Sequence, residues 1–252
     1  MKIAFITGGA TGIGRATVDR FIKEGISVGL FDRNESAAED ALREHGEDKL
    51  LTITGDVTNR DDVRRGVAST VERFAGLDIV FTCAGIHRNN SILDIEEDEW
   101  NAVLDINLRG TFYTLGETAP VLVERGGGAI ILMGSDQCFI GKPSSLAYGA
   151  SKGAIGQMAK SLAIDLGPRN IRVNAICPGT TRTPLAESAF NRAAEAMNRD
   201  VEELWEMETA RYPLGRVGAP DDIADVVYFL ASDDARWVTG ALYAVDGGLV
   251  AG

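Results

Sequence analysis

Short apolar runs alternate along the chain with longer segments in which apolar residues recur at helical spacing. The runs are nearly continuous in apolar and β-branched residues, which is typical of parallel strands that are buried on both faces. This alternation continues along the whole chain and predicts an α/β fold with a doubly wound parallel sheet of about seven strands. The predicted strands are 3–7, 27–31, 50–57, 78–85, 129–135, 171–179 and 242–248.

Residues 184–213 break this rhythm, because a polar, helix-prone segment is inserted between the sixth strand and the helix that follows it. Inserts at the carboxyl ends of strands in such folds commonly cover ligands. We therefore expect a substrate lid at about 184–213, with an ordinary surface helix as the alternative. No linker, repeat or low-complexity tract divides the chain, so residues 1–252 are expected to form a single domain.

Composition and charge exclude several classes of function. The chain has 252 residues and a formal net charge of −12, which argues against nucleic acid or an anionic membrane as the main partner. No apolar run approaches the roughly 20 residues of a transmembrane helix, and the start of the chain does not resemble a signal peptide. Three cysteines without a CxxC motif, and two histidines without a partner at metal-ligand spacing, predict neither a disulfide framework nor a metal site. We expect a cytoplasmic protein without a catalytic metal.

A glycine-rich stretch, ITGGATGIGRAT, joins the first predicted strand to the helix that follows it. Gly8, Gly12 and Gly14 allow a tight turn and the close approach of a pyrophosphate, which the N–H groups at the start of the helix can bind. Asp32 ends the next strand, where a carboxylate can hold a ribose diol and would repel a 2′-phosphate by roughly 4 kcal/mol. These features predict a dinucleotide site that prefers NAD over NADP. Arg33 works against that preference, because its side chain could pair with a phosphate.

A second motif, YGASK at 148–152, places Tyr148 and Lys152 on one face of a predicted helix. Both side chains ionise near pH 10 in water, so a tyrosine is a poor base at neutral pH. Lowering the Tyr148 pKa by about three units requires roughly 4 kcal/mol of preference for the phenolate. The ammonium group of Lys152 can supply a part of that preference.

Taken in order, these and other motifs resemble the short-chain dehydrogenase/reductases, in their single-domain branch of about this length. The resemblance covers nearly the whole chain and implies a Rossmann-type sheet, a nicotinamide cofactor and alcohol–ketone chemistry. The motifs that carry it are TGGATGIG, GDV, CAG, WNAVLDINLRGTF, MGS, YGASK, NAICPG, PLGRVGAPDDIA and the terminal VDGG. The chain departs from the family pattern at Thr82 and Cys83, where the family usually carries asparagines.

The resemblance implies a role for each member of a catalytic group. Tyr148 would be the general base in oxidation and the acid in reduction, and Lys152 would tune it and contact the ribose. Ser135 would hydrogen-bond the substrate oxygen, and Asn107 would hold a water in a proton relay with Lys152. The implied cofactor-binding residues are Gly8, Thr11, Gly12, Ile13, Gly14, Asp32, Arg33, Asp56, Val57, Cys83, Ala84, Gly85, Tyr148, Lys152, Pro178, Gly179, Thr181 and Thr183.

The loops on the predicted substrate side are polar. They carry His87, Arg88 and Asn89 after the fourth strand, Asp136, Gln137 and Cys138 after Ser135, and Arg182 beside Thr183. This indicates a small hydroxylated or anionic substrate such as a sugar, sugar acid, polyol or hydroxy acid, and argues against a steroid or a long acyl chain. We single out Gln137, His87 and Arg182 as candidate substrate contacts, with exposure to solvent as the alternative.

We therefore expect an NAD-dependent oxidoreductase that interconverts a secondary alcohol and a ketone. An NADPH-dependent ketoreductase of the 3-oxoacyl reductase type is the alternative among enzymes. A catalytically silent NAD-sensing module is the alternative outside them, but such a module should lack a member of the catalytic group, and all four are present. By the same resemblance we expect a homotetramer, with a dimer as the alternative.

Overall fold

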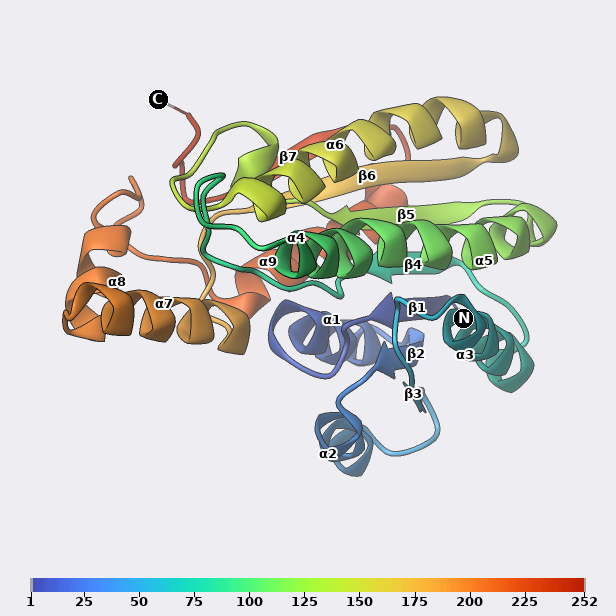
Figure 1. Cartoon of the computed structure of the whole chain (residues 1–252). Coiled ribbons are helices and arrows are strands. Elements are labelled where there is room, and N and C mark those ends of the chain that lie inside the picture. The colour runs from blue at the N-terminus through green and yellow to red at the C-terminus, as the bar shows by residue number, and fades with distance from the viewer. Residues whose placement is uncertain (1, 252) are drawn as a thin grey trace.

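The seven strands form one parallel sheet in the computed structural model of the chain, which describes residues 2–251 (Figure 1). Their spatial order is β3-β2-β1-β4-β5-β6-β7, so the winding direction reverses between β1 and β4. Ligands of such sheets bind beyond the carboxyl ends of the strands, at this switch point. The strands are β1 (Ile3–Thr7), β2 (Ser27–Asp32), β3 (Leu50–Thr54), β4 (Ile79–Thr82), β5 (Gly128–Met133), β6 (Ile171–Pro178) and β7 (Leu242–Val245).

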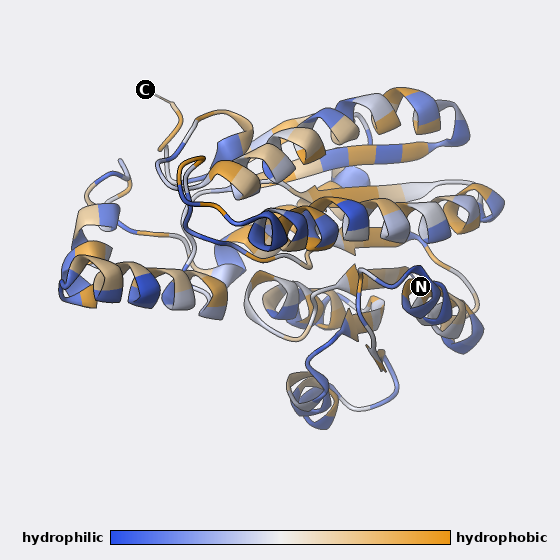
Figure 2. Ribbon diagram, in the orientation of Figure 1, coloured by the Kyte–Doolittle hydropathy of each residue, from blue (hydrophilic) through white to orange (hydrophobic). Residues whose placement is uncertain are grey.

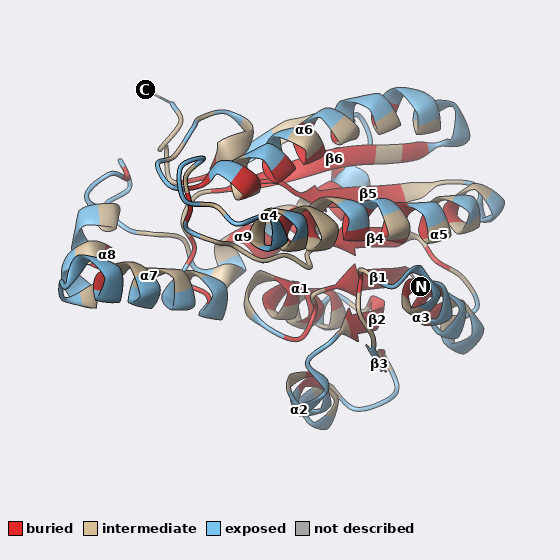
Figure 3. Ribbon diagram, viewed as in Figure 1, coloured by how far each residue is buried: buried red, intermediate tan, exposed pale blue. Residues whose placement is uncertain are grey.

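Helices cover both faces of the sheet, as the nearly continuous apolar runs predicted. Side chains alternate along each strand between two apolar cores, so that Ile6 of β1 belongs to one core and Phe5 to the other. Figure 2 shows the strands as mainly hydrophobic, and Figure 3 shows the central strands as buried, whereas the edge strands β3 and β7 are mostly half-buried or exposed. The first core is completed by α1 (Gly12–Lys23), α2 (Glu35–His45) and α9 (Pro220–Ala231), and the second by α3 (Arg60–Phe74), α5 (Gly110–Arg125) and α6 (Leu146–Leu166), with α4 (Glu97–Leu104) packed against α6.

Three strands end three residues earlier than the sequence predicted, namely β3, β4 and β7, the last of which ends at Val245 rather than at residue 248. β3 ends at Thr54 and β4 at Thr82, whereas the predicted strands ran to residues 57 and 85. The reason is that their neighbours end there: Asp32, the last residue of β2, pairs with Thr54, and Thr7, the last residue of β1, pairs with Thr82. The residues that follow β3 and β4 therefore lie in loops at the carboxyl edge of the sheet, where they can contact a ligand.

The inserted segment forms two helices, α7 (Pro184–Met197) and α8 (Val201–Thr209), beside the carboxyl ends of the strands and away from the two helical layers (Figure 1). The rings of Phe190 and Trp205 stack with centroids 3.9 Å apart and an interplanar angle of 5°. Trp205 is buried, so this polar segment has an apolar contact of its own that holds α7 against α8.

Two expectations from composition concern membranes and metals. Within residues 2–251, no helix is long and apolar enough to cross a bilayer. Over the same residues, no three side chains of His, Cys, Asp or Glu gather in a way that would hold a metal ion.

Candidate active site

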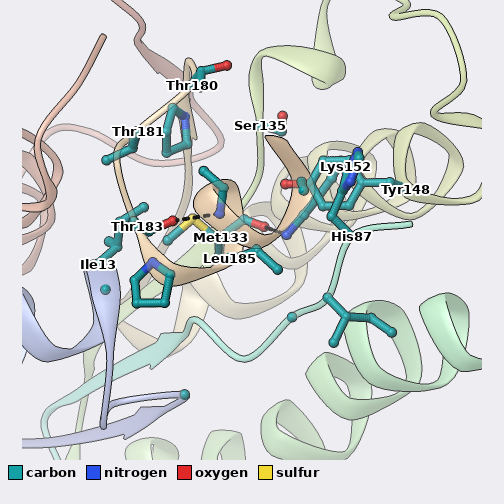
Figure 4. A pocket seen from close by; sticks show the side chains of 18 of the residues that line it. Ile13, His87, Met133, Ser135, Tyr148, Lys152, Thr180, Thr181, Thr183 and Leu185 are labelled. Carbon is teal, nitrogen blue, oxygen red and sulfur yellow. Dashed lines mark hydrogen bonds between the residues drawn. The ribbon is translucent and has the colours of Figure 1, made fainter. Parts of the chain in front are cut away.

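A cavity of about 840 Å³ lies at the carboxyl ends of the strands and extends to the α7–α8 pair. Figure 4 shows Ser135, Tyr148, Lys152 and His87 together on one side of it. Three predicted site residues, Gly14, Asn107 and Arg182, do not line it. The predicted residues that do are Gly8, Thr11, Gly12, Ile13, Asp32, Arg33, Asp56, Val57, Cys83, Ala84, Gly85, His87, Ser135, Gln137, Tyr148, Lys152, Pro178, Gly179, Thr181 and Thr183.

The glycine loop makes a tight turn between β1 and α1. Gly8 and Gly12 have φ values of +68° and +54°, a region that glycine enters without strain. Gly14 serves packing, because a Cβ atom there would lie 2.0 Å from the carbonyl oxygen of Gly8. Gly14 therefore lets α1 sit directly on the loop, which places the start of the helix at the cavity.

The start of α1 fits a phosphate group. The side chain of Thr11 does not cap the helix, and its first turn contains no acidic residue. The first N–H groups of the helix are therefore open to an anion. Thr11, Gly12 and Ile13 line the cavity at this point, so this end of it can hold the pyrophosphate of a nicotinamide dinucleotide.

Asp32 fixes the loop and faces the same end of the cavity. Its Oδ2 atom accepts a hydrogen bond from the backbone N–H of Ala10 at 3.0 Å, and its Oδ1 atom accepts one from Asn34 at 2.9 Å. A carboxylate can accept about four hydrogen bonds, so two positions remain for the hydroxyls of a ribose. Arg33 is exposed and also lines the cavity, as the sequence left open.

The catalytic group is assembled from the end of β5 and the start of α6. Ser135 follows Met133, the last residue of β5, while Tyr148 and Lys152 lie one turn apart on α6. Lys152 is 2% exposed, and its Nζ atom donates a hydrogen bond to the Met133 carbonyl oxygen at 2.7 Å. Burial lowers the pKa of Lys152 to about 8. The lysine is therefore mainly an ammonium at neutral pH, and it lies 5.4 Å from the centroid of the Tyr148 ring.

The expected lowering of the Tyr148 pKa is not seen in the protein itself. Burial raises the pKa of this phenol above its ordinary value, and a hydrogen bond with Ser135 works in the opposite direction. The reason is that the ammonium of Lys152 lies against the Met133 carbonyl group, while the phenol is removed from water. Additional positive charge in the cavity is needed before Tyr148 can act as a base near neutral pH.

Asn107 holds the loop after β4 rather than lining the cavity. It lies in a π-helical turn, Asp105–Arg109, between α4 and α5. Its Nδ2 atom donates to the carbonyl oxygen of Ile86 at 3.0 Å and to Ser151 Oγ at 3.1 Å, and its Oδ1 atom accepts from the N–H of Ile86 at 2.8 Å. Asn107 therefore ties Ile86, which lines the cavity, to α6. Its part in a proton relay stays a prediction.

Comparison with known proteins agrees with this geometry. The family model described as enoyl-(acyl carrier protein) reductase matches residues 8–250. The 3-oxoacyl-(acyl-carrier-protein) reductase FabG of Thermotoga maritima is 34% identical over 251 residues, which are 99% of this chain and 98% of that protein. The chain belongs to the short-chain dehydrogenase/reductase family. It is thus an oxidoreductase of a family that uses NAD or NADP.

Solved structures of similar sequence have the same fold as this short-chain dehydrogenase. A short chain dehydrogenase family protein from Francisella tularensis has a TM-score of 0.90 at 36% identity, with 100% of both chains covered. An aldohexose dehydrogenase from Thermoplasma acidophilum has a TM-score of 0.87 at 31% identity, with 100% of this chain and 94% of that chain covered. The single-domain α/β fold predicted from the sequence is confirmed.

His87 and Gln137 line the cavity of this dehydrogenase, and their contact with a substrate stays a prediction. The rings of His87 and Tyr148 pack edge to face with centroids 4.8 Å apart. Burial lowers the pKa of His87 to about 4, so its ring is neutral at pH 7. His87 thus supports the Tyr148 ring and presents an uncharged surface to a substrate.

Arg182 is the one predicted substrate residue that points elsewhere. Its guanidinium group lies over the Trp205 ring, 4.9 Å from the centroid, and its side chain is half exposed. The reason is the alternation of side chains in an extended segment. Thr181 and Thr183 are buried and line the cavity, so the residue between them faces away from it. The structure therefore does not place Arg182 at the cavity, and its contact with a substrate stays a prediction without support from this geometry.

Two charged residues of the cavity wall were missed in the sequence. Lys142 Nζ lies 2.6 Å from Asp136 Oδ2 and 3.9 Å from Glu208 Oε1. Glu208 also pairs with Arg211 at 2.8 Å. Lys142 and Glu208 are far apart along the chain and stand in no recognisable motif, so only the folded structure brings them together.

The α7–α8 side of the cavity is mainly apolar apart from Glu208, which the polar loops did not indicate. Residues of α7 and α8 supply this wall: Leu185, Ala189, Phe190, Ala193, Met197, Leu204 and Met207. This end of the cavity therefore has a polar wall on the β5–α6 side and a mainly apolar wall on the α7–α8 side. The sequence predicted only the first of these.

Proposed function

We propose that this dehydrogenase interconverts a secondary alcohol and a ketone on a small hydroxylated substrate, with NAD as the preferred cofactor. The observation that carries the proposal is the layout of one cavity. Ser135, Tyr148 and Lys152 converge at one end of it, and the glycine loop and Asp32 form the other. A bound dinucleotide can therefore extend from Asp32 to the catalytic group.

Each residue of the catalytic group has a separate part in the proposed reaction. The nicotinamide ring supplies the hydride acceptor or donor. Ser135 and Tyr148 both line the cavity at the same end, so they can contact one substrate oxygen together. In oxidation, Tyr148 takes the proton of the substrate hydroxyl group, while Ser135 holds the same oxygen. Lys152 supplies a fixed positive charge that favours the phenolate form of Tyr148.

Asp32 supports the preference for NAD. Its carboxylate lies at the end of β2 and accepts hydrogen bonds from the backbone N–H groups of Ala10 and Asn34, so it cannot easily turn away from a ribose. A 2′-phosphate beside it would meet repulsion of roughly 4 kcal/mol for each pair of unit charges. The alternative, an NADPH-dependent ketoreductase, is favoured by Arg33, which lines the cavity next to Asp32, and by the similarity to FabG.

We also infer a homotetramer as the working assembly, as the family resemblance implies. The long central helices α5 and α6 carry apolar side chains on their outer sides. Phe112 is 55% exposed and Ile164 is 76% exposed. Contact between such helices of neighbouring subunits would remove these side chains from water.

A single substitution tests whether the chain is an enzyme rather than a sensor. The formation of NADH is followed by absorbance with polyols, sugars and hydroxy acids as substrates. We expect Tyr148→Phe to lower kcat at least a hundredfold while NADH still binds, because only the proton acceptor is lost. Tyr243→Phe, an exposed position on β7, serves as the control and keeps wild-type activity. Full activity of Tyr148→Phe would contradict the proposal.

A further inference from the structure

The wall of the cavity next to Ser135 contains a buried ion pair that the proposed chemistry does not use. Asp136 is 2% exposed, and Lys142 Nζ lies 2.6 Å from its Oδ2 atom. The other oxygen of Asp136, Oδ1, accepts a hydrogen bond from Ser135 Oγ at 2.8 Å. A charged pair thus lies one hydrogen bond away from the hydroxyl group that contacts the reacting oxygen.

Two of the cations at the substrate end, Lys142 and Arg211, are already paired with carboxylates. Lys142 is shared between Asp136 and, at 3.9 Å, Glu208 of the lid, and Arg211 pairs with Glu208 at 2.8 Å. His87 is neutral at pH 7. Apart from Lys152, each cation that lines this end among the described residues therefore faces a carboxylate. An anionic substrate would have to approach two carboxylates, and this like-charge contact disfavours it.

The pair has hydrogen-bonding capacity left over for a neutral group. Asp136 Oδ2 receives no hydrogen bond of regular geometry from the described residues, although Lys142 lies beside it. An ammonium group has three N–H donors, and a carboxylate only accepts. A hydroxyl group is a small neutral group that can donate to Asp136 and accept from Lys142 through a single oxygen. The pair therefore matches a hydroxyl group better than it matches an anion or an apolar group.

The position of the pair limits where that hydroxyl group is on the substrate. Ser135 holds the reacting oxygen in the proposed function. Asp136 follows Ser135 in the sequence and accepts a hydrogen bond from its hydroxyl group. The two oxygens of a vicinal diol lie at a similar separation to two hydrogen-bonded oxygens. We propose that Asp136 and Lys142 form a subsite that selects neutral substrates with a second hydroxyl group on the carbon next to the reacting carbon. Oxidation of such a diol by NAD gives an α-hydroxyketone, NADH and a proton.

Three substrates that share one reacting group test this subsite, which rests on the proposed function. They are 2-butanol, 2,3-butanediol and 3-hydroxybutyrate, compared by kcat/KM with NAD and with NADP. We expect 2,3-butanediol to exceed each of the other two by roughly tenfold or more, the equivalent of about 1.4 kcal/mol. If 2-butanol or 3-hydroxybutyrate matches the diol, the subsite is wrong and the proposed function stands. If none is oxidised, both are contradicted.

Substitution of Lys142 tests whether this residue is responsible for the preference for the diol. We expect Lys142→Met to lower the ratio of kcat/KM for 2,3-butanediol to that for 2-butanol by roughly tenfold, because the diol loses its donor and Asp136 loses its partner. Lys160→Met, an exposed position on α6, is the matched control and keeps the wild-type ratio.

A double variant keeps the test decisive if the single one does not fold. Asp136→Asn/Lys142→Met removes both charges at once and leaves no unpaired ion in the wall. It should show the same lower ratio, with a folded far-UV circular dichroism spectrum. A folded variant of either kind that keeps the full preference for the diol would overturn the subsite.

Discussion

Lys152 Nζ donates a hydrogen bond to the carbonyl oxygen of Met133 at 2.7 Å, and this contact ties the start of α6 to the end of β5. Ser135 follows Met133 closely in the chain, so the same contact fixes the lysine relative to the serine. The ammonium group is almost fully buried and lies 5.4 Å from the centroid of the Tyr148 ring. A fixed positive charge next to the phenol is the arrangement that the proposed proton transfer requires.

Removing that charge should stop catalysis. We expect Lys152→Met to lower kcat at least a hundredfold, because the phenolate form of Tyr148 loses its nearest fixed positive charge. The Met side chain fills much of the same buried space, so the variant should remain folded. Steady-state kinetics of NADH formation measure the effect, with Lys160→Met on the same helix as the control. A Lys152→Met enzyme within threefold of the wild type would show that the lysine does not tune Tyr148.

The burial of His87 should make the protein less stable in acid. Its pKa is about 4 in the folded protein and about 6.5 in the unfolded chain. Between these values the unfolded chain binds a proton that the folded protein does not, so the free energy of unfolding falls as the pH drops through this window. We expect His87→Gln to remove on the order of 2 kcal/mol of that fall, since glutamine does not titrate. Urea unfolding of both proteins at pH 7 and pH 4.5 measures it, and an identical fall would show that His87 titrates normally.

Two glycines on helices should respond in opposite ways to alanine. Gly14→Ala places a methyl group 2.0 Å from the Gly8 carbonyl oxygen, so α1 must move away from the loop. We expect it to lower the free energy of unfolding by about 2 kcal/mol or more and to weaken cofactor binding. Gly153→Ala on α6 has nothing within 4 Å and should raise stability by about 0.5–1 kcal/mol. Denaturant unfolding separates the two, and a neutral Gly14→Ala would contradict the packing described here.

Arg182 should be dispensable for turnover. Its side chain covers Trp205 on the outer side of the lid and does not line the cavity. We expect Arg182→Ala to keep kcat/KM within about threefold of the wild type, with only the loss of a partly exposed cation–π contact of about 0.5–1 kcal/mol. A drop in kcat/KM of more than tenfold would place Arg182 back among the substrate contacts.

The sequence predicts those parts of the site that come from one continuous segment. The glycine loop and its helix, or Tyr148 and Lys152 on one helix, are set by local geometry, and the structure places them as expected. The ends of strands are harder to predict from the sequence, because β3 and β4 end where their partners β2 and β1 end. The direction in which a single loop side chain points is still harder to predict from the sequence, as Arg182 between Thr181 and Thr183 shows.

Contacts between distant loops lie outside what the pattern of residues indicates. Lys142 and Glu208 meet only because the segment after β5 and the lid fold to the same end of the sheet. The π-helical turn that directs Asn107 to Ile86 depends on tertiary contacts with α6 and has no signal of its own in the sequence. Both features were found only in the structure, as was the Asp136–Lys142 pair that carries the proposed choice of substrate.

Parallel fluorescence titrations with NADH and NADPH measure the cofactor preference of this cavity. We expect a Kd for NADH that is lower than that for NADPH by roughly tenfold or more, because the fixed carboxylate of Asp32 accepts ribose hydroxyls and repels a phosphate. Asp32→Asn should reduce that difference. Equal or tighter binding of NADPH would show that Arg33 outweighs Asp32 and would contradict the preference for NAD. Failure of both cofactors to bind would contradict the assignment of this cavity as the dinucleotide site.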